Sequence, residues 1–106
     1  LAEQDMRLKE AEKMARTVIE KEKKNNTFLD TYAWVLYKRG KVREAARIME
    51  RIIASDDNDD AEYYEHYGFI LKKMGKCREA AVNWEIAIAK DETKSELRKE
   101  IENCKR

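Results

Sequence analysis

The stretch "AWVLYKRGKVREAARIME" occupies residues 33–50, and a close counterpart, "GFILKKMGKCREAAVNWE", occupies residues 68–85. Aligning residues 27–56 with 62–91 gives thirteen identities in thirty positions, where chance would give roughly two. The identities include Tyr32/Tyr67, Leu36/Leu71, Gly40/Gly75 and Ala45/Ala80. The chain therefore contains a duplicated unit, and what one unit folds into the other should fold into as well.

The apolar residues within each unit follow a helical period. Leu29, Tyr32, Ala33 and Leu36 are spaced i, i+3, i+4 and i+7, which is one stripe of a helix. A second stripe follows after Gly40, and it consists of Val42, Ala45, Ala46, Met49, Ile52 and Ile53. The chain has no proline and three glycines, and Gly40 and Gly75 stand where a helix C-terminus favours a residue with left-handed dihedrals. The pattern predicts an all-α fold in which each unit is an antiparallel helical hairpin.

Both ends of the chain continue the pattern. Residues of about 5–23 align with the second helix of a unit, so we expect a truncated repeat at 1–24, repeats at 26–57 and 60–91, and a C-terminal capping helix at 92–106. That last helix would bury Leu97, Ile101 and Cys104, spaced i, i+4 and i+7. Residues 1–106 are expected to form a single domain. Because the chain starts at Leu1, we expect a fragment whose missing helix lies upstream.

These units resemble the tetratricopeptide repeat family, whose pattern is W-x2-L-G-x2-Y, then G, then A-x3-F-x2-A, then P. The matching residues are Leu29, Tyr32, Ala33, Leu36, Gly40, Ala45, Met49 and Ile52, and then Tyr64, Tyr67, Gly68, Leu71, Gly75, Ala80, Trp84 and Ala87. The closing proline is replaced by Asp57 and Glu92. The strings "FLDTYAWVLY" and "YEHYG" are also similar to tetratricopeptide proteins of Gram-negative bacteria. The resemblance implies a right-handed solenoid of about two and a half repeats plus a capping helix. We expect the small residues Ala33 and Gly68 to let paired helices approach closely.

The resemblance also implies a concave groove, lined by the first helix of each unit, that binds a peptide or a partner protein. The residues expected there are Asp30, Trp34, Tyr37, Lys38, Glu65, Phe69, Lys72 and Lys73. Trp34 and Phe69 are equivalent positions and should lie side by side. Two explanations remain open for these aromatic residues, because they could anchor a partner or pack neighbouring units together. The acidic residues near helix starts and the lysines near helix ends are also explained by the helix dipole alone.

The overall charge and the apolar runs exclude two classes of partner. With 23 basic and 22 acidic side chains, the net charge is +1, which argues against a nucleic-acid binder. No apolar run approaches the roughly 18 residues that span a membrane, so we expect no direct membrane insertion. The compartment stays open between cytoplasm and periplasm.

Catalytic and metal-binding motifs are not recognisable. The run "DDNDD" at residues 56–60 lacks the glycine and glutamate of a calcium loop, since Ala61 and Tyr67 hold those places. We expect its last aspartate to cap the following helix. His66 is the single histidine and has no nucleophile at a recognisable spacing. We therefore predict no enzyme activity, no metal site and no cofactor.

Cys77 and Cys104 should lie at the same level of two antiparallel helices. A disulfide could form between them in an oxidising compartment. Two reduced thiols on apolar stripes are what we expect instead.

Two functional hypotheses follow. The first is a protein–protein interaction module that binds through the groove. The second is a purely structural end-segment of a longer solenoid, which packs on its own upstream repeats or forms a homodimer through residues 1–24. An exposed apolar face on that first helix would favour the second hypothesis.

Overall fold

The computed structural model describes residues 7–14, 16 and 25–105. Residues 7–14 and 16 are helical. The helices that follow are α2 (Asn26–Lys38), α3 (Val42–Ala54), α4 (Ala61–Lys73), α5 (Cys77–Lys90), the short 3-10 helix η1 (Glu92–Lys94) and α6 (Leu97–Cys104). The described part of the chain contains no strand, so the all-α prediction is confirmed for it. The remainder of the predicted helix over residues 1–24 lies outside the described residues.

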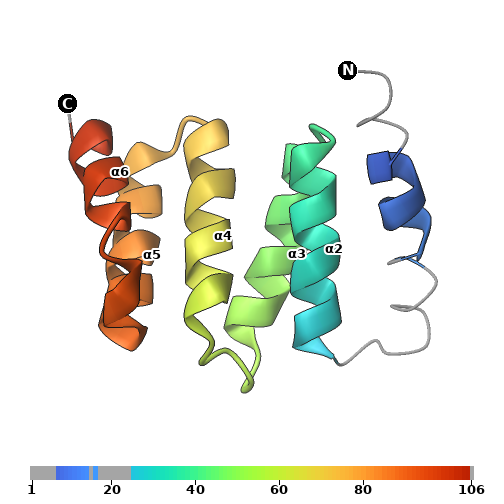
Figure 1. Ribbon diagram of the computed structural model, residues 1–106, viewed down its shortest axis with the longest axis horizontal. Helices are drawn as coiled ribbons and strands as arrows, with labels where there is room; N and C mark the ends of the chain where they lie inside the picture. Colours follow the sequence, from blue (N-terminus) through green and yellow to red (C-terminus); the bar gives the residue numbers. More distant parts are fainter. Residues whose placement is uncertain (1–6, 15, 17–24, 106) are drawn as a thin grey trace.

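The helices lie side by side and alternate in direction, so that α2 with α3 and α4 with α5 form two hairpins (Figure 1). The principal extents are 37 × 36 × 23 Å, and the shortest of them corresponds to about two helix diameters. Each hairpin has a three-residue turn, and a longer segment over residues 55–60 connects the two hairpins. This arrangement follows from the sequence, because one amphipathic hairpin buries its apolar face only when another hairpin packs on it.

Both hairpin turns have the same hydrogen-bonded geometry. Gly40 has φ +86° and Gly75 has φ +79°. The Gly40 amide donates to the Tyr37 carbonyl at 3.0 Å, and the Lys41 amide donates to the Leu36 carbonyl at 2.8 Å. This pattern is the Schellman motif, which requires a left-handed residue at the position of Gly40. The predicted role of both glycines is confirmed.

The two helices of the second hairpin approach each other closely at Gly68. A Cβ atom on Gly68 would lie 2.2 Å from the indole nitrogen of Trp84. Trp84 is fully buried, and its indole N–H donates to the backbone carbonyl of Glu65 at 3.3 Å. The equivalent residues of the first hairpin, Ala33 and Met49, are also fully buried. The prediction that a small residue permits close helix approach is confirmed at Gly68.

Side chains cap the first turns of α2 and α4. The Asn25 carboxamide accepts hydrogen bonds from the amides of Thr27 and Phe28 at 3.0 and 3.3 Å. The Asp60 carboxylate accepts one from the Glu62 amide at 2.9 Å. Such caps satisfy helix N–H groups that have no partner within the helix. The cap predicted for the last aspartate of the run 56–60 is confirmed.

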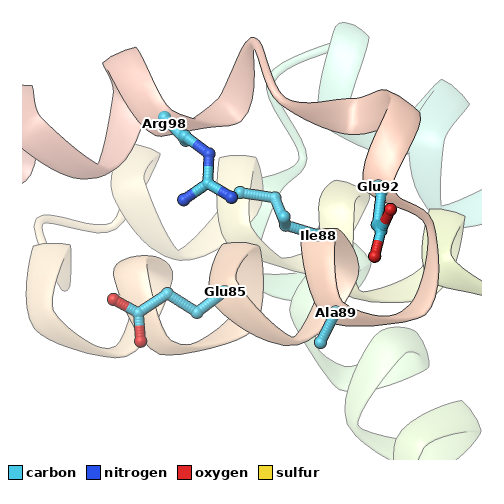
Figure 2. Close-up of a pocket in the computed structure, with 5 residues that line it drawn as sticks. All are labelled: Glu85, Ile88, Ala89, Glu92 and Arg98. Atoms are coloured by element: carbon cyan, nitrogen blue, oxygen red, sulfur yellow. The ribbon is translucent and has the colours of Figure 1, made fainter.

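The C-terminal helix is shorter than predicted. The expected helix from Glu92 is wrong over its first turns, because residues 92–94 form η1 and α6 begins at Leu97. The Asp91 carboxylate accepts hydrogen bonds from the Thr93 amide and hydroxyl at 3.0 and 2.6 Å, which closes a tight turn. Leu97 and Ile101 are buried as expected. A pocket of about 440 Å³ lies between α5 and the segment from η1 to α6 (Figure 2).

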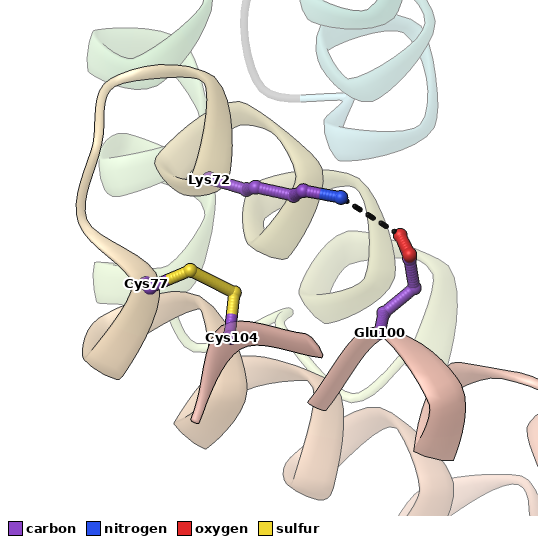
Figure 3. Close-up of a disulfide and its surroundings, with 4 residues drawn as sticks. All are labelled: Lys72, Cys77, Glu100 and Cys104. Carbon is purple, nitrogen blue, oxygen red and sulfur yellow. Dashed lines mark hydrogen bonds and ion pairs between the residues drawn. A yellow bond between two sulfur atoms is a disulfide. The ribbon is translucent and has the colours of Figure 1, made fainter. Parts of the chain in front are cut away.

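A disulfide joins α5 to α6. Cys77 and Cys104 are bridged with a Cα–Cα distance of 5.1 Å (Figure 3). The antiparallel packing brings both residues to the same level, as expected. The expected reduced state is wrong, and the alternative of a disulfide applies. Lys72 adds an ion pair to Glu100 at 3.1 Å, which connects α4 to α6.

An ion-pair network attaches the first helical segment to the first hairpin. The Glu12 side chain is buried, and both Arg39 and Lys41 contact its carboxylate, the latter at 3.0 Å. Arg16 lies 3.6 Å from the same carboxylate. Arg39 and Lys41 flank Gly40, so the hairpin turn itself supplies the cations. Met14 on the same segment is 71% exposed.

Candidate functional site

The candidate site is a cluster of aromatic rings on α2 and α4. The ring of Trp34 stacks on Tyr37, with centroids 4.8 Å apart and planes at 20°. It also stacks on His66 of α4, at 4.1 Å and 21°. Phe69 meets the Trp34 ring edge-on at 6.2 Å. The predicted neighbourhood of Trp34 and Phe69 is thus confirmed, and the rings of two hairpins form one contiguous surface, named here the aromatic cluster (Trp34, Tyr37, His66 and Phe69).

Each ring of the aromatic cluster is partly exposed. Phe69 also contacts the buried Trp84 at 5.2 Å, so the cluster rests directly on the core. Rings in this position help to hold the two hairpins together and still present an apolar face to solvent. Both explanations considered for Trp34 and Phe69 are therefore compatible with the contacts.

A positive charge lies beside the cluster. The Lys38 ammonium group is 5.0 Å from the centroid of the Trp34 ring and 5.9 Å from that of Tyr37. A cation at such a distance is attracted by the ring quadrupole. Lys38 is exposed, so its charge stays available to solvent. Lys73 is exposed as well, in the last turn of α4.

Asp30 lies below this surface, with 5% of its area exposed. The Nδ1 atom of His66 contacts both of its carboxylate oxygens, at 2.9 and 3.0 Å. With Nδ1 as the donor, the imidazole satisfies a carboxylate that would otherwise be costly to bury. Asp30 therefore fixes the orientation of the His66 ring, and that ring in turn stacks on Trp34.

Glu65 and Lys72, two further residues predicted for the groove, contact the C-terminal segment. The Lys94 ammonium group donates to the Glu65 carboxylate at 2.7 Å, and this hydrogen bond raises the pKa of Lys94. Lys72 pairs with Glu100 of α6. The structure thus brings together Trp34, Tyr37, Lys38 and Phe69, whereas Glu65 and Lys72 connect α4 to the chain beyond α5.

His66 was missed as a site residue. The repeat alignment places it opposite Thr31, because the offset between units is 35, whereas its contact with Asp30 spans 36 residues. The alignment matches equivalent positions and therefore does not reveal side chains that touch across two units. The available signal was that a lone histidine stood one residue after the equivalent of Asp30.

The pocket between α5 and α6 offers little chemistry by comparison. Its lining residues are Glu85, Ile88, Ala89, Glu92 and Arg98 (Figure 2). None of these side chains is a thiol, a hydroxyl or an imidazole, so the pocket contains no pairing of nucleophile and base. It lies away from the aromatic cluster, on helices that contribute no ring to it.

No helix in the described part of the chain is long and apolar enough to cross a bilayer. Comparisons with protein-family models, with curated proteins and with solved structures found no match. The function is therefore argued from the aromatic cluster and its surroundings alone.

Proposed function

We propose that the chain is a protein–protein interaction module that binds a peptide or partner protein on the face formed by α2 and α4. The observation that carries this proposal is the aromatic cluster, in which partly exposed rings from both hairpins lie in contact beside the exposed Lys38. Rigid aromatic rings resting on a packed core are the groups that contribute most to binding at protein interfaces. The module needs no catalytic activity of its own.

The duplicated hairpins support a tetratricopeptide-type solenoid as the scaffold of this module. Both hairpins have helices of 13 or 14 residues. Both also have a Schellman turn at glycine and a small residue at the middle of the first helix. In such a solenoid the first helices of successive units share one face, which is where the aromatic cluster lies. We propose that α6 takes the place of a further first helix and caps the stack.

The chemistry of the face indicates the kind of partner. An apolar or aromatic side chain would cover Trp34 and Phe69, and an acidic group would approach Lys38 and Lys73 at the turn end of the helices. Opposite charge at this position would steer association and make it sensitive to salt. The disulfide favours an oxidising compartment. Of the cytoplasm and the periplasm, the periplasm is the oxidising one, and we propose it as the location of the chain.

Peptide selection from a random library, followed by fluorescence anisotropy with the selected sequences, tests the proposal. We expect selected peptides to combine aromatic or aliphatic residues with Asp or Glu. Trp34→Ala with Phe69→Ala should weaken binding about 30-fold or more, since central aromatic anchors contribute 2 kcal/mol or above. Val82→Ala on α5, where Val82 is 55% exposed, is the matched control and should bind normally. Equal binding by both variants would remove the α2–α4 face from consideration.

A second candidate function is the structural one, favoured by the first helical segment. Met14 is 71% exposed there while Glu12 is buried, so the segment turns an apolar side chain outward. In this proposal the segment packs on upstream repeats or on a second copy of the chain through residues 1–24. Sedimentation equilibrium distinguishes the cases, because a dimer that dissociates with Met14→Lys supports the structural role and a concentration-independent monomer contradicts self-association.

A further inference from the structure

Three side chains that can coordinate a metal ion converge where α2 meets α4. One donor atom from each of Asp30, Glu62 and His66 lies within 4.8 Å of the other two. Glu62 and His66 are four residues apart on α4, which places them on one face of that helix. Asp30 approaches from α2. The group is therefore held by two helices of different repeats, at the base of the aromatic cluster.

The geometry is close to that of a metal site. Ligand atoms bound at about 2.1 Å to one tetrahedral ion lie about 3.4 Å from each other. The Asp30 oxygens already lie 2.9 and 3.0 Å from Nδ1 of His66, so these two ligands would separate slightly. Glu62 is exposed, and one of its carboxylate oxygens already lies within 4.8 Å of the donor atoms of the other two residues.

The environment of these ligands favours a cation. Asp30 and His66 are both largely buried, with 8% and 17% of their side-chain areas exposed. Such burial excludes water and strengthens the attraction between a carboxylate and a cation. The two carboxylates supply negative charge to the site, and the nearby Lys94, which hydrogen-bonds to Glu65 and also interacts with Glu62, offsets part of it.

The composition of the chain makes this site distinctive. The sequence holds one histidine and two cysteines, and the two cysteines are joined to each other. Borderline metals such as Zn²⁺ prefer imidazole or thiolate ligands over carboxylates alone. His66 is consequently the one side chain of this kind that remains available in the oxidised chain.

We propose that Asp30, Glu62 and His66 bind a divalent transition cation of the Zn²⁺ class, with Nδ1 of His66 and one oxygen of each carboxylate as ligands and water at the open position. On binding, the proton of Nδ1 is transferred to Nε2 by way of solvent, so that the imidazole keeps its one proton and offers the lone pair of Nδ1 to the metal. The bound ion replaces the hydrogen bond between Asp30 and His66 as the connection between α2 and α4. Because a metal bound to Nδ1 lies in the plane of the imidazole, the ion is at the edge of the ring that stacks on Trp34.

Isothermal titration of ZnCl₂ into the untagged, oxidised chain tests the proposal. The expected result is one Zn²⁺ per chain, with a dissociation constant in the micromolar range or below, about 10⁻⁶ M. Because the chain has one histidine, the nitrogen resonances of His66 report the ligand atom without ambiguity. A shift of Nδ1 on titration is expected, and a shift confined to Nε2 would contradict the proposed geometry.

The variants Glu62→Gln and His66→Gln should each weaken Zn²⁺ binding about tenfold or more, because each removes a direct ligand. Glu65→Gln is the matched control, since Glu65 lies between these residues on α4 but pairs with Lys94, and it should bind Zn²⁺ as the parent does. Exposed Glu62 is not part of the core, so its variant folds even if the His66 variant does not. Absence of binding at about 1 mM Zn²⁺, or equal weakening in Glu62→Gln and Glu65→Gln, overturns the proposal. Peptide binding measured in EDTA, which removes Zn²⁺, tests the interaction module independently of the proposed metal site.

Discussion

The two hairpins have nearly the same turn and the same pair of buried alanines at the start of the second helix (Ala45 and Ala46, then Ala80 and Ala81). They nevertheless fill the space between their helices differently. The first hairpin has Ala33 and Met49 at positions where the second has Gly68 and Trp84, and all four residues are buried. The second hairpin combines the larger ring with the smallest residue, because the indole occupies the place where a Cβ atom would stand. Close packing fixes the combined volume of the pair rather than either residue alone. Repeats of one pattern are therefore not interchangeable residue by residue.

The hairpins also differ in what covers their outer sides. The first is covered by a segment whose buried Glu12 contacts the cations of the hairpin turn. The second is covered by α6, which a disulfide and the buried Leu97 and Ile101 hold in place. One cover depends on charge and the other on a covalent bond with apolar contacts, so the two should respond differently to salt and to reductant.

The largest expected effect on stability comes from removing the disulfide that holds α6 on the second hairpin. The disulfide closes a sequence separation of 27 residues, and a loop of that length corresponds to about 3.5 kcal/mol of stabilisation in the chain-entropy description. Cys77→Ser with Cys104→Ser should lower the free energy of unfolding by about that amount. Urea titration of the oxidised, reduced and doubly substituted chains measures it. The urea midpoint of the doubly substituted chain should be the same with and without reductant. An unchanged urea midpoint when the parent chain is reduced would contradict the prediction.

A smaller effect is expected when the packing of the second hairpin is made like that of the first. Gly68→Ala places a methyl group against the rigid Trp84 ring and should destabilise the chain by about 2 kcal/mol, as overpacking commonly does. Trp84→Met together with Gly68→Ala reproduces the pair found in the first hairpin. Gly68→Ala should therefore cost much less stability in a chain that already carries Trp84→Met than it costs in the parent. A double-mutant cycle from thermal unfolding gives the coupling energy, and simple additivity of the two changes would show that the residues do not share one space.

The turns should show no difference between the hairpins. Gly40→Ala and Gly75→Ala each force a Cβ atom into a left-handed conformation, which costs about 1 kcal/mol. Neither added Cβ would meet an atom within 4 Å, so the cost is purely conformational and should be equal in both hairpins. Asparagine at either position, which tolerates this conformation better, should cost less in the same urea titration. A cost confined to one turn would mean that the turns are not equivalent.

The smallest effect concerns alkaline pH. Tyr63 is 4% exposed, and burial raises the pKa of its phenol in the folded chain. The stability that this provides is fully present below about pH 10, the pKa of an unfolded tyrosine, and is lost as the pH rises through the folded pKa. Tyr63→Phe introduces the residue that the first hairpin has at the equivalent position, Phe28. The unfolding free energy of this variant should fall less steeply between about pH 9.5 and 11.

The unfolding free energy of Tyr63→Phe should still fall to some extent as the pH rises above about 9.5. Burial raises the pKa of Tyr67, and the hydrogen bond to Glu65 raises that of Lys94, and both groups lose stabilisation in the same direction. Tyr37→Phe serves as the matched control because its ring is only partly buried. Parallel pH profiles of Tyr63→Phe and the parent would contradict the assignment.

The sequence predicts much of this fold because the repeat reports the same information twice. The apolar periods, the glycines of the turns and the aspartate at the end of the run 56–60 correspond to helices, turns and a cap in the structure. The start of α6 could not be read from periodicity, because Asp91 and Thr93 form a local turn that competes with the helix. The spacing placed Cys77 and Cys104 at the same level, but whether two neighbouring thiols are oxidised depends on the compartment rather than on the sequence pattern.

The candidate site was only half visible in the sequence. The repeat alignment identified Trp34 and Phe69 as neighbours because equivalent residues of successive helices lie side by side. The contact between Asp30 and His66 joins positions that are not equivalent, so it depends on the crossing of α2 and α4 rather than on any pattern. Glu65 and Lys72 were assigned to the groove from the family resemblance. Their contacts with Lys94 and Glu100 involve residues outside the repeated units, so the repeat pattern could not predict them.

The contrast between the two covers has a mechanical consequence. If the chain is pulled from its two ends, force at the C-terminal side reaches α5 through the bond between Cys77 and Cys104, so α6 cannot be peeled away from it while the bond is intact. At the other side the load falls first on the contacts of Glu12 with Arg39 and Lys41. Rupture should therefore begin at the N-terminal segment and proceed toward α5, giving the array a fixed order of yielding under tension.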